Sequence, residues 1–269
     1  MTFEHSKVLI KYLFQEDPSR SIFKKIIFKS YLLIYLVTEL LFGAILSTKI
    51  FKIFRKIKLK TRLNNGYLIN HKIEHIPYLY DLQNFDDKIH TNKKKILFDI
   101  GAHIGSFALK YTNKNNKIYA FEPNKENYSF LLQNIKDNKL DKRIAAFNFA
   151  ISNKNGSKNL KLSEGSGGHS FHIKSKKFEK VKTFTIHTFC KTNRIGHIDI
   201  IKIDVEGDEL NILIGANEII KKMNPLIIIE LHPWYISPKK IIKKLEEFNY
   251  RIDTIDGLKI YTVKNTKNF

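Results

Sequence analysis

Residues 95–105 read KILFDIGAHIG, and this stretch decides the fold. Its first six residues, Lys95–Ile100, form a short apolar run that predicts a buried strand, and Ile104–Tyr111 then follows a helical pattern. Between them, Gly101 and Gly105 allow the backbone to turn tightly and to approach a ligand at the start of a helix. A strand, a glycine turn and a helix in this order predict the first unit of an α/β fold with a parallel sheet.

The same alternation of short β-branched runs and amphipathic stretches continues to the end of the chain. Helices are predicted between the strands, one of them beginning at Ser237-Pro238 with Ser at the N-cap. The pattern predicts a doubly wound, mostly parallel, seven-stranded sheet that ends in an antiparallel hairpin. The glycine-rich stretch 153–180 interrupts it as either a mobile flap or a short extra hairpin. The further strands are predicted at residues 117–121, 144–151, 198–203 and 226–231, and the hairpin at 250–255 and 258–263.

Residues 1–90 lack this alternation and are expected to form an N-terminal helical extension to a domain of residues 91–269. Within the extension, the largely apolar residues 30–48 contain no basic residue and one acid, Glu39. As a helix they would span roughly 28 Å, which is close to the thickness of the hydrocarbon core of a bilayer. A cluster of seven basic residues without an acid follows, between Lys49 and Arg62.

Three interpretations of this segment compete. A transmembrane helix at residues 30–48 would place Glu39 at its midpoint, which costs roughly 3 kcal/mol. A cleaved signal peptide would need a short basic start that the chain lacks. We favour a helix that lies on a membrane or against the main domain, so that residues 20–62 meet an anionic membrane surface. A cytoplasmic protein with peripheral membrane association is expected, and the lone Cys190 fits a reducing compartment.

The composition excludes several classes of protein. A hydrophobic fraction of 43% with 12% aromatic residues excludes intrinsic disorder, and a single cysteine excludes an intrachain disulfide scaffold. The net charge of +21 invites a nucleic-acid interpretation, yet only six of the 47 basic residues are Arg, whose planar fork binds phosphates and bases bidentately. A solvated, lysine-covered surface is therefore favoured, and nucleic acid is not expected as a partner.

Ligands of an open α/β sheet bind beyond the carboxyl ends of its strands, so the residues after each strand are the candidates for a site. Glu122 and Pro123 follow the second strand, and Glu122 lies 21 residues after Gly101. An acid placed in this way can accept hydrogen bonds from both hydroxyls of a ribose. The glycines Gly101 and Gly105 are spaced G-x-x-x-G instead of G-x-G-x-x-G, which argues against a nicotinamide or flavin cofactor.

Acids and a histidine follow the fourth and fifth strands. The turn DVEGDE, residues 204–209, holds four acids, and a helix N-terminus that favours negative charge accounts for the last two. His232 is either a general base, because its ordinary pKa is about 6.5, or a structural cap of the fifth strand. A divalent ion at the acids is the alternative to a metal-free site, which is favoured. The candidate catalytic residues are Asp204, Glu206, Glu230 and His232.

Five stretches together resemble, in order and spacing, the FkbM-type S-adenosylmethionine-dependent methyltransferases: ILFDIGAHIG, IYAFEPNKENYSFLLQNI, AISNKNG, IDIIKIDVEGDEL and LIIIEL. The resemblance covers residues 91–235 and implies a Rossmann-like methyltransferase fold. One departure is His187, which stands where the family commonly has an Asp. The resemblance implies that the glycine turn holds the methionine part of the cofactor, the acid after the second strand its ribose, and residues after the third strand its adenine. The implied cofactor-binding residues are Asp99, Gly101, Ala102, Gly105, Glu122, Pro123, Ala150 and Ile151.

The resemblance also implies the reaction, which is transfer of a methyl group from S-adenosylmethionine to a hydroxyl of a sugar, a glycan or a small metabolite. The expected mechanism combines orientation of the acceptor with general base catalysis by Asp204, Glu206 or His232. Two alternatives are a membrane-associated binding protein with a non-catalytic methyltransferase fold and a nucleic-acid methyltransferase. The second lacks support from a base-reading Asn-Pro-Pro-Tyr tetrapeptide, because none follows the fourth strand.

Overall fold

The computed structural model of the chain describes residues 56, 58–63, 65–72, 75, 93–164, 167–254 and 259–264. The chain divides into two compact units, Met1–Leu59 and Lys60–Phe269, and nearly all described residues belong to the second. The surface helix predicted at residues 30–48 lies outside the described residues, as does most of the segment 20–62. Within the described part of the chain, none of the helices has both the length and the apolar character needed to cross a bilayer.

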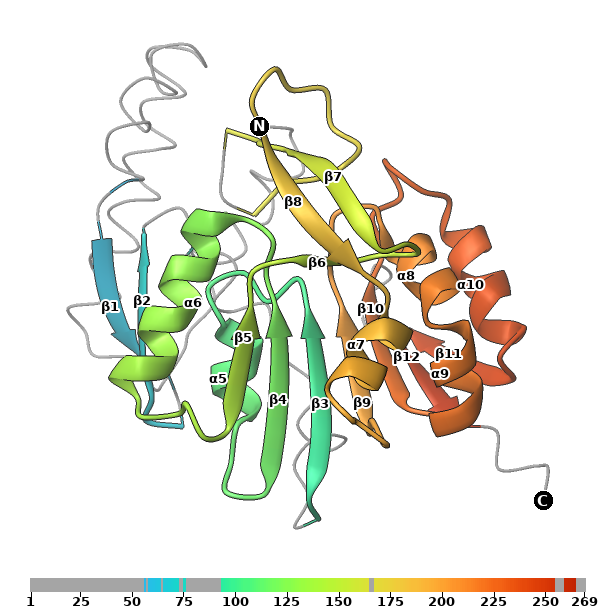
Figure 1. The fold of residues 1–269 in the computed structure, drawn as a ribbon, viewed down its shortest axis with the longest axis horizontal. Helices are drawn as coiled ribbons and strands as arrows, with labels where there is room; N and C mark the ends of the chain where they lie inside the picture. Colours follow the sequence, from blue (N-terminus) through green and yellow to red (C-terminus); the bar gives the residue numbers. More distant parts are fainter. Residues whose placement is uncertain are drawn as a thin grey trace. The chain divides into compact units, whose positions relative to one another are not determined.

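Among the described residues, seven strands form the main sheet, in the spatial order β11-β12-β10-β9-β3-β4-β5 (Figure 1). All neighbouring pairs in this sheet are parallel except the two that involve β12, which runs antiparallel to β10 and β11. The predicted doubly wound sheet with a terminal antiparallel hairpin is confirmed. Its strands are β3 (Lys95–Ile100), β4 (Asn116–Phe121), β5 (Ile144–Phe147), β9 (Ile200–Ile203), β10 (Leu226–Glu230), β11 (Tyr250–Thr254) and β12 (Lys259–Lys264).

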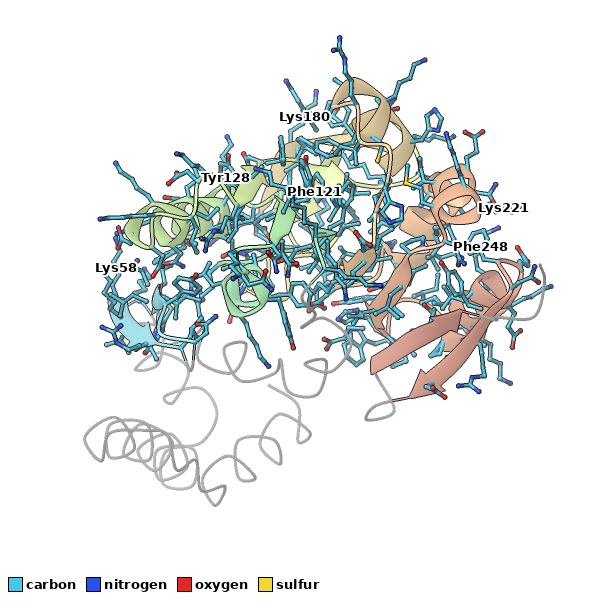
Figure 2. The ribbon with its side chains drawn as sticks, turned by 90° about the horizontal axis from the view of Figure 1, so that it is seen from below. Lys58, Phe121, Tyr128, Lys180, Lys221 and Phe248 are labelled. Carbon is cyan, nitrogen blue, oxygen red and sulfur yellow. The ribbon has the colours of Figure 1, made fainter. Side chains whose placement is uncertain are left out.

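Helices cover both faces of the sheet because successive residues of its buried strands point to opposite sides. Leu97 of β3 joins a core with α5 and α6, whereas the next residue, Phe98, joins a second core with α7, α8, α9 and α10. Figure 2 shows Phe121 of β4 enclosed within the structure, while Lys180 and Lys221 point outward. The helices are α5 (Ser106–Tyr111), α6 (Lys125–Asp137), α7 (Ile186–Thr192), α8 (Glu209–Gly215), α9 (Asn217–Met223) and α10 (Pro238–Glu246).

The third predicted strand, residues 144–151, is wrong as a single element. Its first half is β5, but its second half is β6 (Ala150–Ile151), which belongs to a separate three-stranded sheet in the order β6-β8-β7. The chain leaves the main sheet at Asn148, whose side-chain amide donates to the carbonyls of Glu122 and Pro123 at 2.9 and 3.0 Å. These two bonds tie the chain to the end of β4 at the point where it turns.

The glycine-rich stretch 153–180 forms an extra hairpin, which was one of its two predicted forms. Its strands are β7 (Gly156–Lys161) and β8 (Phe178–Phe184), paired antiparallel over six residues from Gly156–Thr183 to Lys161–Phe178. A long loop joins them, and an isolated bridge between Lys161 and Ser170 fixes part of that loop to the end of β7. The hairpin therefore extends the fold beyond the carboxyl edge of the main sheet (Figure 1).

A second small hairpin lies before the main sheet, where the sequence predicts a helical extension. Its strands are β1 (Lys58–Arg62) and β2 (Leu68–Lys72). The backbone amides of Leu68 and Asn70 donate to the side chains of Asn138 and Asn134, at 2.7 and 2.6 Å, next to or within α6. Residues 58–62 and 68–72 thus form strands instead of helix, because α6 and the residue after it present amide side chains that complete the hydrogen bonds of β2.

Candidate active site

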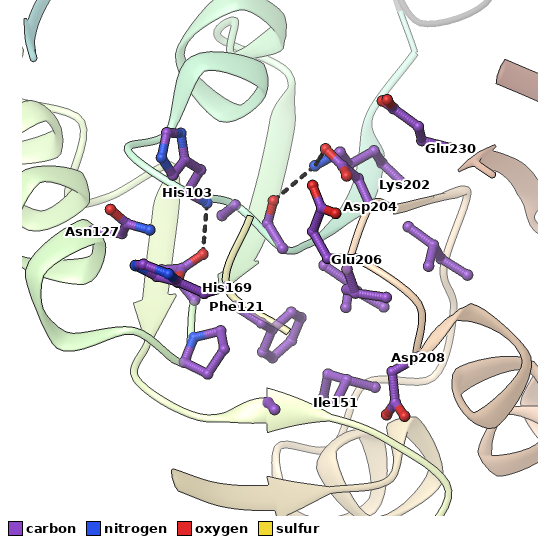
Figure 3. Close-up of a pocket in the computed structure, with 18 of the residues that line it drawn as sticks. His103, Phe121, Asn127, Ile151, His169, Lys202, Asp204, Glu206, Asp208 and Glu230 are labelled. Atoms are coloured by element: carbon purple, nitrogen blue, oxygen red, sulfur yellow. Dashed lines mark hydrogen bonds and ion pairs between the residues drawn. The ribbon is translucent and has the colours of Figure 1, made fainter. Parts of the chain in front are cut away.

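One pocket lies at the carboxyl ends of β3, β4, β9 and β10, and the hairpin β7–β8 contributes to its wall. Figure 3 shows His103, Asn127 and His169 on one side of it, and Lys202, Asp204, Glu206 and Glu230 on the other. Three predicted site residues do not line it: Asp99, Gly105 and His232. The predicted residues that do line it are Gly101, Ala102, Glu122, Pro123, Ala150, Ile151, Asp204, Glu206 and Glu230.

The glycine turn lies tightly between the ends of β4 and β9. The backbone amides of Gly101 and Ala102 both donate to the carbonyl of Phe121 at 3.0 Å. Gly101 has a φ of +78°, and a Cβ added to it would lie 1.7 Å from the carbonyl oxygen of Asp204. No residue with a side chain fits there, so the glycine allows the ends of β3 and β9 to meet in the pocket floor.

Glu122 stands at the start of the segment after β4, with only 6% of its surface exposed. Its two carboxyl oxygens accept hydrogen bonds from the backbone amides of His103 and Asn124, at 2.8 and 2.9 Å. Burial nevertheless raises the pKa of Glu122 to about 7. Each carboxylate oxygen has a second lone pair, so Glu122 can still accept hydrogen bonds from a ligand in the pocket.

Lys202 is a pocket residue that the sequence interpretation missed. Its ammonium lies 3.3 Å from both Asp99 Oδ1 and Asp204 Oδ2, and it donates to the carbonyl of Gly101 at 2.8 Å. Burial opposes its charge, but Asp204 and Asp99 outweigh that effect and raise the pKa of Lys202. Its signal in the sequence is a basic residue among the isoleucines of the run IDIIKI. Asp99 therefore lies beneath the pocket, where it pairs with Lys202.

His232 lies behind the acidic turn and is 2% exposed. Its Nδ1 bonds to the buried carboxylate of Glu209 at 2.6 Å, and its Nε2 faces Glu206 Oε1 at 3.6 Å and Asp204 Oδ1 at 3.8 Å. Burial lowers the pKa of His232, but the hydrogen bonds to Glu206 and Glu209 and the charge of Asp204 raise it in sum to about 11. The imidazole is therefore protonated near neutral pH.

Asp204, Glu206 and His232 each offer one ligand atom within 4.8 Å of the others, which is a grouping that could hold a metal ion. Carboxylates and an imidazole suit several divalent metals. Two cations already balance the acids, however, because Lys202 lies 3.3 Å from Asp204 and His232 carries a proton at neutral pH. A divalent ion at these three ligands would have to displace that proton and lie close to the ammonium of Lys202.

The last two acids of the turn are buried, and not merely solvated acids at a helix N-terminus. Asp208 accepts hydrogen bonds from Ser152 Oγ at 2.6 Å and Lys158 Nζ at 3.2 Å, and so ties the strands β6 and β7 to the start of α8. Glu209, with no exposed surface, orients His232. The sequence shows the acids but does not show that they are buried, because their partners come from distant segments.

Among the other missed residues is His103, which turns inward at the glycine turn. Its ring packs edge-to-face against that of His75, with centroids 4.9 Å apart, and burial lowers the pKa of His103 to about 3. Asn127 and His169 complete this side of the pocket, and no sequence motif marks either of them. His187, at the position where the resemblance would place an Asp, pairs with Glu218 at 2.9 Å on the surface.

The strand order with β12 as its antiparallel member, the glycine turn after β3 and the acid after β4 together define a Rossmann-like S-adenosylmethionine-dependent methyltransferase. The family model described as "Methyltransferase FkbM domain" matches residues 99–252, which is more than half of the chain. The chain belongs to the FkbM methyltransferase family.

Relatives differ in how much of the chain they cover. The hexuronic acid methyltransferase AglP of Haloferax volcanii is 24% identical over 180 residues, which are 65% of this chain and 73% of AglP. A tRNA (guanine(37)-N(1))-methyltransferase of Xenopus tropicalis is 46% identical over 55 residues, only 20% of this chain and 11% of that enzyme. The crystal structure of an FkbM methyltransferase from Methylobacillus flagellatus KT is 18% identical with a TM-score of 0.46, covering 66% of this chain and 46% of that one.

Proposed function

We propose that this protein transfers a methyl group from S-adenosylmethionine to a hydroxyl of a sugar, in a glycan or a small metabolite. The observation that carries the proposal is the division of one pocket into two sides. Glu122 lies on one side, next to His103 of the glycine turn, and the carboxylates of Asp204 and Glu206 lie on the other. The relative named a hexuronic acid methyltransferase supports a sugar as the acceptor.

The residues on the first side fit the cofactor. Gly101 lines the pocket with its backbone alone, and the buried Glu122 can accept hydrogen bonds from ribose hydroxyls. Ala150 and Ile151 offer an apolar wall for an adenine ring. When bound, S-adenosylmethionine supplies an electrophilic methyl group on a positively charged sulfur.

The second side supplies the base. Asp204 and Glu206 line the pocket and can accept the proton of a hydroxyl as it becomes a nucleophile. Lys202 pairs with Asp204 at 3.3 Å, and Glu209 holds the protonated His232 with its Nε2 toward both carboxylates. His232 therefore orients the carboxylates and neutralises them, and it can act as a base only after it has lost its proton. No step of this mechanism requires a metal, so activity is expected to survive treatment with EDTA.

The mechanism is tested by measuring methyl transfer at saturating cofactor in Asp204→Asn, Glu206→Gln and His232→Ala variants. Loss of the base is expected to lower kcat by about 10²- to 10⁴-fold, the usual contribution of a general base. The exposed acid Asp141 provides a matched control, and Asp141→Asn is expected to leave kcat unchanged. Full activity in all three site variants would remove this mechanism.

A further inference from the structure

Three aromatic side chains, Trp234, Tyr235 and His172, form a rim beside the acidic turn, and the transfer chemistry does not use them. The ring centroids of Trp234 and Tyr235 are 6.0 Å apart, and those of Tyr235 and His172 are 6.2 Å apart. Trp234 and Tyr235 follow β10, whereas His172 comes from the loop between β7 and β8. This aromatic rim thus joins two segments that are distant in the sequence.

The aromatic rim is fixed to the turn that carries Glu206. A Cβ added to Gly207 would lie 2.7 Å from Tyr235 Cβ and 2.9 Å from His172 Cδ2, so both rings pack directly on this glycine. On the loop side, Ser170 Oγ donates to the carbonyl of Glu206 at 2.5 Å. The amide of Tyr235 donates to the carbonyl of His232 at 2.9 Å, which closes the turn after β10.

Trp234 is 61% exposed, which is the largest exposed fraction among the exposed large hydrophobic side chains of the described residues. Its ring lies edge-to-face against that of His232, with centroids 5.5 Å apart. The Nε2 of His232 in turn lies 3.6 Å from Glu206 and 3.8 Å from Asp204, the two carboxylates of the pocket. An exposed indole therefore stands one side chain away from the proposed base.

An exposed indole close to two carboxylates is chemically suited to bind a carbohydrate. A pyranose ring has an apolar face of C–H groups, which an exposed indole can cover, and hydroxyl groups around its edge, which carboxylates accept as hydrogen-bond donors. A flat aromatic acceptor could use the indole but would offer fewer hydroxyls to the paired acids. If Trp234 only faced water, its position beside the pocket would have no function, whereas an exposed apolar surface at such a place is typical of a ligand-binding site.

We propose that the aromatic rim is the acceptor subsite, in which Trp234 covers the apolar face of a pyranose ring whose hydroxyls point toward Asp204 and Glu206. The inference rests on the proposed function and deepens it, because it names the part of the molecule that selects a sugar. It also assigns a role to the loop between β7 and β8, which brings His172 to the rim.

Direct binding is measurable because Trp234 is the single tryptophan of the chain. The full chain, saturated with S-adenosylhomocysteine, is titrated with the methyl glycosides of glucuronic acid, glucose, galactose, mannose and rhamnose. At least one of them is expected to change the tryptophan emission saturably, while glycerol at the same concentration is expected to cause no saturable change. A panel without any saturable change would overturn the subsite.

Substitution separates the subsite from the chemistry. Trp234→Ala is expected to raise KM for the sugar at least tenfold, about 1.4 kcal/mol, while kcat and the affinity for S-adenosylhomocysteine stay within twofold. Trp234→Phe is expected to retain part of the effect. The matched control is Phe178→Ala, which removes another exposed aromatic side chain, 52% exposed, at the start of β8 and outside the aromatic rim, and it is expected to leave KM unchanged.

These experiments distinguish a failure of the acceptor subsite from a failure of the proposed function. Methyl transfer to a sugar with an unchanged KM in Trp234→Ala would overturn the subsite and leave the proposed function standing. Saturable binding of a sugar, lost in Trp234→Ala, in a protein that methylates none of the sugars it binds would overturn the proposed function and leave the subsite standing.

Discussion

Lys202 balances the charge of the pocket at the level of single residues. Its ammonium lies between the buried Asp99 and the pocket residue Asp204, and its hydrogen bond to Gly101 joins the ends of β3 and β9. Burial raises the pKa of Asp99, and the charge and hydrogen bond of Lys202 act against that rise. The lysine therefore supports both the glycine turn and the proposed base.

Lys202→Met is expected to destabilise the fold by about 3 kcal/mol, because removal of one partner leaves a buried charge uncompensated. The free energy of unfolding in urea measures this loss. The double variant Lys202→Met with Asp99→Asn is expected to recover part of the stability, since the orphaned charge is then gone. Lys221→Met, on the exposed surface of α9, is the control, and a loss no larger than that of the control would contradict the role of Lys202.

The raised pKa of Glu122 predicts that cofactor binding depends on pH. Its pKa is raised to about 7 by burial, so its carboxyl is largely protonated at pH 6 and largely ionised at pH 8. Because the ionised form accepts hydrogen bonds from both ribose hydroxyls, the affinity for S-adenosylhomocysteine is expected to rise several-fold across this range. Isothermal titration of the wild type and of Glu122→Gln tests the assignment, and an equally steep rise in the variant would exclude Glu122 as its source.

The same residues show what the sequence could and could not predict about the site. Glu122 follows from its distance to the glycine turn, and Asp204 follows from its place at the end of an apolar run. The burial of Asp208 and Glu209 does not follow, because Ser152, Lys158 and His232 reach them only in the folded chain. Spacing along the chain predicts strand ends, whereas ion pairs depend on which strands become neighbours.

At the level of elements, periodicity predicted the strands and helices of the main sheet but not the point where the chain leaves it. Residues 144–151 read as one apolar run, yet β5 and β6 belong to different sheets. The break depends on two hydrogen bonds from Asn148 to the end of β4, and these are contacts with a segment about 25 residues earlier. The local sequence pattern does not indicate contacts with distant segments.

The hairpin β7–β8 is anchored through Asp208, and this anchor gives a prediction at the element scale. Asp208→Ala removes the acceptor of Ser152 and Lys158, and is expected to lower the free energy of unfolding by about 1–3 kcal/mol. The exposed pair of Lys60 and Asp137 is the control, because Lys60→Ala is expected to change stability by less than about 1 kcal/mol. Equal effects of both substitutions would contradict the anchoring role.

At the scale of the whole molecule, the net charge of +21 has two parts. Lysines such as Lys180 and Lys221 point outward from the described domain and are spread over its surface (Figure 2). A denser cluster lies between Lys49 and Arg62, next to the apolar residues 30–48. We propose that this second part meets an anionic membrane surface, since several bases near such a surface contribute about 1 kcal/mol each.

Binding of the full chain to vesicles tests this proposal. The protein is expected to sediment with vesicles that contain phosphatidylserine and to be released from them by high salt. It is not expected to bind vesicles of phosphatidylcholine alone. Replacing Lys49, Lys52 and Lys56 by Gln is expected to weaken binding, while the same change at Lys174, Lys176 and Lys177 serves as the matched control. Retention through a carbonate wash would instead indicate a spanning segment, and no binding at low salt would contradict the proposal.

The pocket at the carboxyl edge of the sheet is proposed to methylate a sugar hydroxyl. The most direct measurement incubates the full chain with S-adenosylmethionine that carries a deuterated methyl group and with the panel of methyl glycosides, and analyses the products by mass spectrometry. The account predicts a gain of one labelled methyl group on a sugar oxygen, abolished in Gly101→Ala. A cofactor-saturated enzyme that labels none of the sugars, but labels RNA or protein, would contradict it.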